Sequence, residues 1–180
     1  MVLLGSKAPA RNVEQHDYFF GIGKSLKELV PQMKAFWPEA GNSLHVDGWR
    51  EVTWVNGFRI QVDLKQQQEP SPSKQLFFIN LGGYQANKLE EQHYTVLSIH
   101  DDLAQAGREA KKTAFYKSNT LKGAGSHIDE KYGIDVDHIY VIEDILPPGE
   151  KEKYQIRITP ADDFAADEIH LGYLKLDKIR

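Results

Sequence analysis

An internal repeat is the feature of this sequence that most constrains its fold. At a fixed offset of 77 positions, seven residues of the first half recur as identical residues in the second half: Leu4, Gly5, Glu14, Gln15, His16, Ile22 and Leu26 fall on Leu81, Gly82, Glu91, Gln92, His93, Ile99 and Leu103. Further along, His45-Val46-Asp47 resembles His127-Ile128-Asp129 at an offset of 82. Two copies are too few for a solenoid. The repeat therefore predicts two similar small units packed as an internal pseudo-dimer.

The repeat includes the start of a helix in each copy. Ser25 and Asp102 correspond at the same offset, and each is followed three residues later by a residue that can close a capping box, Glu28 or Gln105. Such a pair satisfies free backbone N–H groups at a helix start. We therefore expect equivalent helices to begin at these two points.

Turn and linker signals divide the chain into the expected units. We interpret Gly5 and Gly82-Gly83 as ending short strands, and Asn56-Gly57 as a hairpin turn in which both residues take positive φ. The segment between Lys65 and Lys74 contains two prolines and no apolar residue, which is typical of a solvated linker. The predicted domains are a first unit at 1–65, a linker at 66–73, and a second unit at 74–180 with a C-terminal extension.

The order strand, strand, helix, strand, strand within each unit predicts an α+β fold, with one helix covering one face of a sheet. A β-grasp-like roll is the favoured arrangement, and a ferredoxin-like arrangement is the alternative. Exposed strand edges in the two units could pair with each other, which would be a physical reason for joining them in one chain.

Composition and charge narrow the functional classes. The absence of cysteine excludes disulfides, zinc–thiolate sites and thiol nucleophiles. A net charge of −4 argues against a nucleic-acid partner, because phosphate attraction supplies most non-specific affinity. Because no long apolar run and no basic leader is present, we expect no membrane partner and a cytoplasmic location.

The repeated polar residues are the candidate functional residues. Glu14 and His16 are two positions apart, so on an extended strand their side chains share a face, and the same holds for His45 and Asp47. If these pairs meet in the fold, they could bind a divalent metal such as zinc, manganese or non-haem iron. The full candidate ligand or metal set is Glu14, His16, His45, Asp47, Glu91, His93, His127 and Asp129.

A structural interpretation of the same residues is the alternative. In it, His16 and His93 are buried at strand starts and bonded to the backbone of the preceding loop, while Glu14 and Glu91 fix their tautomers. Histidines serve such structural roles more often than they bind metals, and the spacing by itself does not choose between the two.

The doubled pattern of Leu-Gly-Gly, Glu-x-His, a capped helix and His-x-Asp resembles the bacterial family known as domain of unknown function 1543. In the second copy the residues are Leu81-Gly82-Gly83, Glu91-Gln92-His93 and His127-Ile128-Asp129; in the first they are Glu14-Gln15-His16, His45-Val46-Asp47 and Trp49. Ser6 stands where the family pattern has its second glycine. The resemblance implies a bacterial protein with tandem domains, and implies no activity, substrate or cofactor.

Two functional classes follow from these observations. The favoured class is a non-catalytic module that binds a small ligand or a protein partner. The alternative is a metal-dependent hydrolase that uses the Glu-x-His and His-x-Asp motifs, with Glu14 or Glu91 as the general base. Neither class identifies the ligand, and self-association into a homo-oligomer is compatible with both.

Overall fold

The computed structural model describes residues 1–65, 73–84, 89–112, 134–162 and 165–180. Contacts divide the chain into two compact units, one formed by Met1–Gln68 together with Ile145–Arg180 and one formed by Glu69–Asp144. Within the described ranges, every helix is too short or too polar to cross a membrane.

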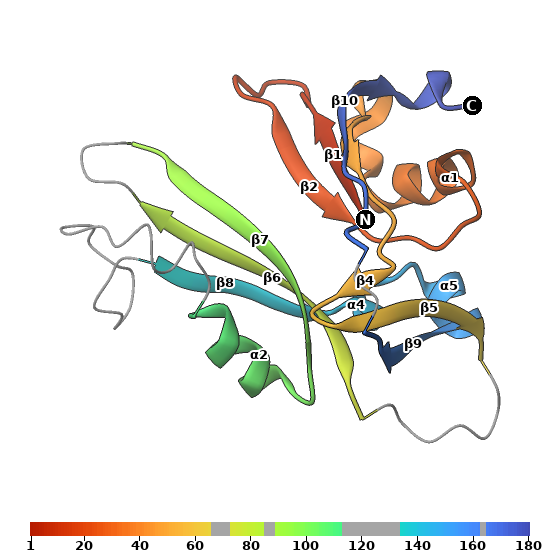
Figure 1. Cartoon of the computed structure of the whole chain (residues 1–180). Coiled ribbons are helices and arrows are strands. Elements are labelled where there is room, and N and C mark those ends of the chain that lie inside the picture. The colour runs from red at the N-terminus through yellow and green to blue at the C-terminus, as the bar shows by residue number, and fades with distance from the viewer. Residues whose placement is uncertain (66–72, 85–88, 113–133, 163–164) are drawn as a thin grey trace. The chain divides into compact units, whose positions relative to one another are not determined.

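The first unit contains a four-stranded antiparallel sheet (Figure 1). Its strands are β1 (Val2–Ser6), β2 (Gln15–Phe19), β3 (His45–Trp49) and β10 (His170–Lys175), and they are arranged in the order β10-β3-β1-β2. β1 therefore lies between the two strands that carry the candidate residues of this unit.

One face of this sheet is covered by the helix α1 (Leu26–Phe36) and the short helices η1 (Pro38–Ser43) and η2 (Leu176–Lys178). Leu4 on β1, Val46 on β3 and Met33 on α1 are almost completely buried against one another. Because side chains alternate between the faces of a strand, burying Leu4 and Val46 on this face directs Gly5 and His45 to the opposite face.

A second, three-stranded sheet also belongs to the first unit. It contains β4 (Trp54–Val55), β5 (Phe58–Leu64) and β9 (Tyr154–Pro160). The short helix α5 (Pro148–Lys153) directly precedes β9 along the chain. The predicted turn is confirmed, since Asn56 and Gly57 have φ values of 51° and 84°. The strand before the turn, β4, is only two residues long. The preceding strand, β3, ends at Trp49 and belongs to the other sheet.

The C-terminal segment belongs to the first unit, whereas the sequence predicts it in the second. It was assigned to the second unit, but β9 pairs with β5 along its whole length and β10 pairs with β3. These hydrogen-bonded ladders place residues 145–180 in the first unit. The α+β class is confirmed, while the strands of residues 1–64 are divided between two sheets and do not form the single layer expected of a β-grasp-like roll.

The second unit is a three-stranded antiparallel sheet with one helix. Its strands β6 (Gln75–Tyr84), β7 (Glu91–His100) and β8 (Ile134–Val141) are arranged in the order β7-β6-β8. The helix α2 (Leu103–Ala110) packs on the sheet through Ala106 and Ala110, which contact the buried Phe77, Ile79 and Leu81. The short helix α4 (Ile142–Ile145) follows β8.

The two units share one supersecondary structure. Gly5 pairs with His16 across β1 and β2, and Gly82 pairs with His93 across β6 and β7, which is the same register at the offset of 77. Both helices are capped as expected, because Ser25 accepts a hydrogen bond from the Glu28 N–H and Asp102 accepts one from the Gln105 N–H. The segments β1-β2-α1-β3 and β6-β7-α2-β8 thus share one order of elements and one pattern of antiparallel pairing.

The glycines of the repeat lie inside strands rather than in turns. Gly5 is the fourth residue of β1, and Gly82 and Gly83 lie within β6. The expectation that they end strands is therefore wrong. Glycine inside a strand commonly marks a point where another group approaches the backbone closely, and the first unit shows which groups do so.

Candidate metal centre

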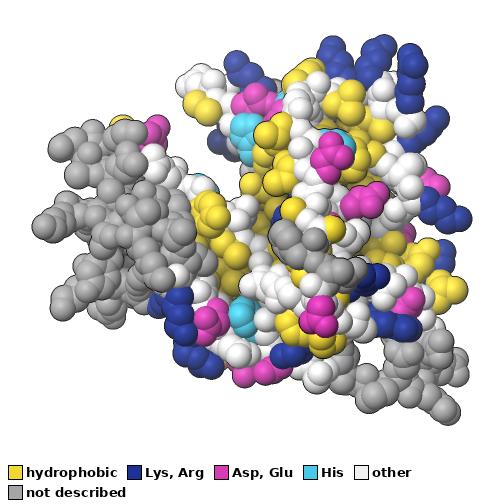
Figure 2. Space-filling model, in the orientation of Figure 1, with side chains coloured by type: hydrophobic (Ala, Val, Ile, Leu, Met, Phe, Trp, Pro, Cys, Tyr) yellow, Lys and Arg dark blue, Asp and Glu magenta, His cyan; other side chains and the backbone are white. Residues whose placement is uncertain are grey.

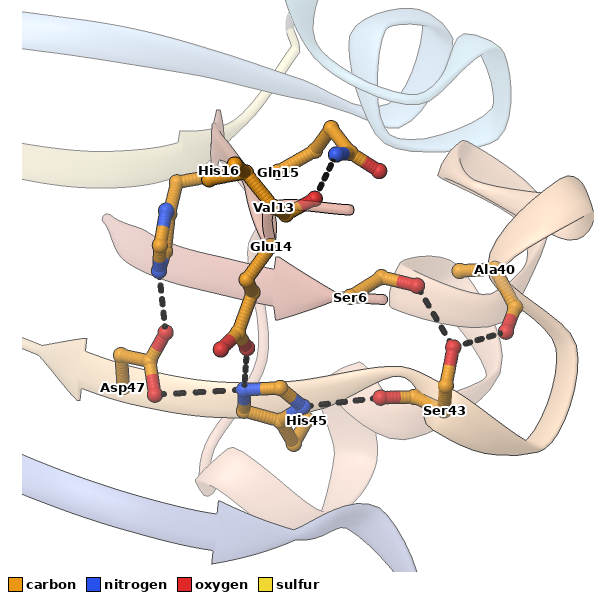
Figure 3. Close-up of polar contacts among 9 residues, drawn as sticks. All are labelled: Ser6, Val13, Glu14, Gln15, His16, Ala40, Ser43, His45 and Asp47. Carbon is orange, nitrogen blue, oxygen red and sulfur yellow. Dashed lines mark hydrogen bonds and ion pairs between the residues drawn. The ribbon is translucent and has the colours of Figure 1, made fainter. Parts of the chain in front are cut away.

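The candidate residues of the first unit converge on one point of the sheet, above Gly5. Glu14 directly precedes β2, His16 lies on β2, and His45 and Asp47 lie on β3. Gly5 on the central strand pairs with His16 on one side and with His45 on the other. Figure 3 shows the Glu14 and Asp47 carboxylates and both imidazoles directed toward one another.

A β-bulge places Asp47 in this group. The pairing of β3 with β1 shifts between Leu3 and Leu4, which face Gly48 and Val46 respectively, so Asp47 is the extra residue. The pairing of β3 with β10 shifts at the same point of β3. Bulges redirect side chains and are frequent beside functional sites.

His45 Nε2 is the centre of the contacts. It lies 2.6 Å from Glu14 Oε1 and 3.3 Å from Asp47 Oδ1. On the outer side, His16 Nε2 lies 3.1 Å from Asp47 Oδ2. One imidazole thus faces two carboxylates, and a second imidazole contacts one of these carboxylates from the other side.

The backbone determines which nitrogen of His45 carries a proton. His45 Nδ1 lies 2.8 Å from the Ser43 carbonyl oxygen, and because a carbonyl only accepts, Nδ1–H is the donor. Ser43 is itself fixed, since its hydroxyl donates to the Ala40 carbonyl oxygen and contacts the Ser6 hydroxyl at 2.7 Å in both cases. A backbone carbonyl that fixes Nδ1–H in this way is typical of metal-binding histidines, whose Nε2 is the ligand atom.

His45 Nε2 and Asp47 Oδ2 are buried and have no hydrogen-bond partner among the described residues. The close contact between Nε2 and Glu14 Oε1 lacks the alignment of a hydrogen bond, so a proton on Nε2 would not point at that oxygen. Buried polar atoms without partners are uncommon and costly. His45 Nε2 and the two carboxylate oxygens therefore lie close together, and a positive charge between them would be stabilising.

Gly5 leaves room for these three atoms. A Cβ atom placed on Gly5 would lie 2.4 Å from Asp47 Oδ2, 2.5 Å from His45 Nε2 and 2.8 Å from Glu14 Oε1. A side chain on Gly5 would therefore collide with all three atoms, and a glycine at this point lets them gather closely over the strand. The ligand atoms of Glu14, His45 and Asp47 all lie within 4.8 Å of one another.

The group is buried on one side and open on the other. The His45 side chain is 6% exposed, whereas the Glu14 side chain is 40% exposed. Tyr173 on β10 covers the His45 ring at a centroid separation of 4.4 Å. In Figure 2, histidine and acidic side chains are grouped at the surface over the β1-β2 hairpin. Ligands could therefore reach the site from solvent.

In the second unit the structure describes only part of the predicted set. Glu91 Oε2 lies 3.5 Å from His93 Nε2, and His127 and Asp129 lie outside the described residues. The proposed match between His45 and His127 is wrong, because Gly5 pairs with His45 whereas Gly82 pairs with Asp135. Asp135-Val136-Asp137 is thus the strand segment that corresponds to His45-Val46-Asp47.

The structural interpretation of His16 and His93 as buried loop anchors is also wrong. Each of these two side chains is 48% exposed. The buried histidine bonded to a loop carbonyl is His45, and its second nitrogen faces carboxylates and not backbone.

Sequence reasoning missed the residues that support the site. The sequence pattern predicts a strand end at Gly5, and it does not single out Ser43 or Tyr173. Gly5 had a usable signal, because it follows three apolar residues and recurs as Gly82 within another apolar run. The Ser43 contact is made by its carbonyl oxygen, which no residue type specifies, and Tyr173 reaches the site only through the unexpected pairing of β10.

Comparison with solved structures identifies the fold. A protein from Idiomarina loihiensis, known from the crystal structure of Il1583, superposes with a TM-score of 0.56 at 19% sequence identity, over 97% of this chain and 94% of that chain. At this identity the likeness concerns the fold alone.

Comparison of sequences then identifies a family for part of the chain. Residues 11–62 match the family described as Domain of Unknown Function (DUF1543), which confirms the predicted resemblance for that segment. The segment contains Glu14, His16, His45 and Asp47. A further match, at 31% identity over 88 residues, is to the ATP-dependent RNA helicase eIF4A of Candida albicans; it covers 49% of this chain and only 22% of the helicase.

Proposed function

We propose that the first unit is a binding module for a divalent transition-metal cation, held by Glu14, His45 and Asp47. The observation that carries this proposal is the convergence over Gly5 of one imidazole nitrogen and two carboxylate oxygens, which all lie within 4.8 Å of one another. A cation between these atoms would coordinate His45 Nε2 and Asp47 Oδ2, which make ion-pair contacts but no hydrogen bond among the described residues.

The donor set favours particular ions. One imidazole nitrogen and two carboxylate oxygens, with the His16 imidazole beside them, suit zinc, manganese or ferrous iron. Calcium and magnesium are less suitable, because they prefer oxygen donors throughout. The two carboxylates would also balance the charge of a divalent ion, so a cation could be held in this partly buried site without a further counter-ion.

This proposal gives a specific form to the non-catalytic binding module, in which the cation itself, or a small ligand bound through it, is what the unit recognises. Three protein ligands leave at least one coordination position for water or for an external ligand. The exposed side of Glu14 is consistent with access to that position.

A metal-dependent hydrolase is the second candidate, and the same open position favours it. A cation there would lower the pKa of a bound water and generate a nucleophile. Glu14 was expected to be the general base, but its 2.6 Å contact with His45 Nε2 supports a role as ligand. His16, which is half-exposed and contacts Asp47 from outside, is better placed to accept a proton from water.

Calorimetric titration with Zn²⁺ and Mn²⁺ tests the proposal. We expect Asp47→Asn to abolish one equivalent of bound metal while the fold is retained, because the substitution keeps the shape and removes the charge. Asp17→Asn is the matched control, since Asp17 lies next to His16 on β2 and bonds only to the neighbouring Tyr18 N–H among the contacts described. Equal metal binding by both variants would refute the proposal.

A further inference from the structure

We propose that the cation site of the first unit binds a small organic acid, whose acid group bridges the cation and Lys175 and whose apolar body lies on Leu171 and Tyr173. This inference rests on the proposed function, and it names the class of ligand that takes the open coordination position. It is carried by β10, whose side chains extend the sheet face on which the three cation ligands lie.

Backbone register places part of β10 on the same face of the sheet as the site. Lys175 pairs with His45, whereas Leu174, the residue before it, packs with the hydrophobic core on the opposite face. Because side chains alternate along a strand, Lys175 lies on the face that carries the His45 side chain. Tyr173 is on this face as well, since its ring centroid lies 4.4 Å from that of His45. Two side chains of β10 therefore flank the buried imidazole.

A third side chain of β10, Leu171, lies on this face beside a β-bulge. The pairing of β10 with β3 shifts just after Leu171, and Gly172 has a φ of 138°. Leu171 lies over Gly48, where an added Cβ would meet the Leu171 Cδ2 atom at 3.1 Å. Gly48 pairs with Leu3 on β1, and Leu3 shares the face of Gly5, which is two residues further along the same strand. Leu171 is therefore on the face of the sheet that carries the site.

The two apolar side chains on this face are largely exposed. Leu171 is 81% exposed and Tyr173 is 63% exposed. Single exposed apolar side chains are ordinary, but two that adjoin a group of cation ligands provide a surface for the apolar part of a bound molecule. Covering them with such a part would be favourable, whereas an inorganic anion on the cation would leave them in water. The surface therefore favours an organic ligand.

The charges at the site favour an anionic group on that ligand. The carboxylates of Glu14 and Asp47 balance a divalent cation, and Lys175 then adds one positive charge beside them. Lys175 is exposed and forms no ion pair within the part of the chain that the structure describes. One carboxylate of a ligand would balance this charge, because it can bind the cation and accept a hydrogen bond from the lysine ammonium. A monocarboxylic acid with an aromatic or alkyl body is the class that fits.

The experiment compares benzoate and acetate as ligands of the full chain loaded with Co²⁺. Co²⁺ occupies nitrogen and oxygen sites of the zinc type, and its visible absorption changes when a carboxylate joins its ligands. The two acids carry the same acid group, so the difference between their affinities measures the contribution of the apolar surface. We expect benzoate to bind about tenfold more tightly than acetate. Equilibrium dialysis of the chain with a chelator should show neither acid bound.

Two variants test the two parts of the ligand. Leu171→Ala should weaken benzoate binding about fivefold and acetate binding not at all, whereas Leu64→Ala, also exposed but in the other sheet, should change neither. Lys175→Gln should weaken the binding of both acids by up to about fivefold. Lys178→Gln, at an exposed lysine on η2, should weaken neither. Co²⁺ is titrated into each variant first, so that every affinity refers to folded chain that has bound the cation.

The outcomes separate this inference from the proposed function. If the chain binds Co²⁺ but benzoate binds no more tightly than acetate, or if Leu171→Ala and Lys175→Gln behave as their controls do, the ligand class is refuted and the cation site stands. If the unmodified chain binds no Co²⁺, both fail. Sedimentation tests another occupant of the surface: a dimer that Leu171→Ala converts to a monomer would mean that a second copy covers it, and would overturn the inference.

Discussion

Replacing Gly5 with alanine places a methyl group against the three atoms that are proposed to bind the cation. The added Cβ would be 2.4–2.8 Å from the ligand atoms of Asp47, His45 and Glu14. The two carboxylates end flexible side chains and can turn away, whereas His45 is held by its bond to Ser43 and by its burial. The substitution should therefore displace the ligand atoms and prevent cation binding, and its contact with His45 should also destabilise the metal-free protein.

The expected magnitude follows from linkage. A cation at about 100 times its dissociation constant stabilises the folded state by about 2.7 kcal/mol. For a chain of this size each kcal/mol shifts the melting temperature by about 2–4 °C, so the unmodified protein should melt about 5–10 °C higher with saturating Zn²⁺ than with a chelator. Gly5→Ala should lose this shift. Without metal its melting temperature should also fall, because the new Cβ would lie 2.5 Å from His45 Nε2 and this buried imidazole cannot turn away as the carboxylates can.

Gly149→Ala is the matched control for this measurement. Gly149 belongs to the same unit, and a Cβ there would meet no described atom within 4 Å. Scanning fluorimetry with Zn²⁺ and with chelator should give the full metal-dependent shift for this variant. If Gly5→Ala keeps the same shift as Gly149→Ala, the space above Gly5 is not the cation site and the reasoning fails.

Three further predictions concern residues around the site and the two folds. Ser6→Ala removes the hydroxyl contact to Ser43, which positions His45, and should weaken Zn²⁺ binding by about 10–100-fold in calorimetry, with unchanged stoichiometry. Gly57→Ala, at a φ of 84°, should lower the free energy of unfolding by about 1 kcal/mol in urea; an unchanged urea midpoint would contradict the strain argument. Burial lowers the pKa of His100 below its usual 6.5, so the unfolded chain binds protons first as pH falls. The second unit should therefore lose stability as the pH falls through about 6.5, the pKa of an ordinary histidine, and His100→Leu should reduce that loss.

Local signals in the sequence predicted local structure well. The turn at Asn56-Gly57 and the caps at Ser25 and Asp102 each depend on residues within four positions, and all three are present. The α+β class followed from the order of such local elements. What the sequence did not predict is which distant strands pair, because the pairing of β10 with β3 joins segments more than a hundred residues apart.

The site was predicted in part for the same reason. The spacing of Glu14, His16, His45 and Asp47 placed each pair on one face of a strand, and the structure brings all four together. The prediction failed for the second copy. His127-Ile128-Asp129 resembles His45-Val46-Asp47 in sequence, but the strand pairing shows that Asp135-Val136-Asp137 is the corresponding segment. A difference in length between copies shifts such an alignment, and only the hydrogen-bond ladder reveals the true correspondence.

The second unit is an insertion within the first, and this has a consequence for how the polypeptide is made. Residues 69–144 form one compact unit that is continuous in sequence, so we expect it to fold before the rest of the chain has been synthesised. The first unit begins earlier along the chain, yet it must wait for β9 and β10 before its two sheets are complete. The segment that is synthesised first should thus be the last to acquire its native structure, together with the proposed cation site beside Tyr173.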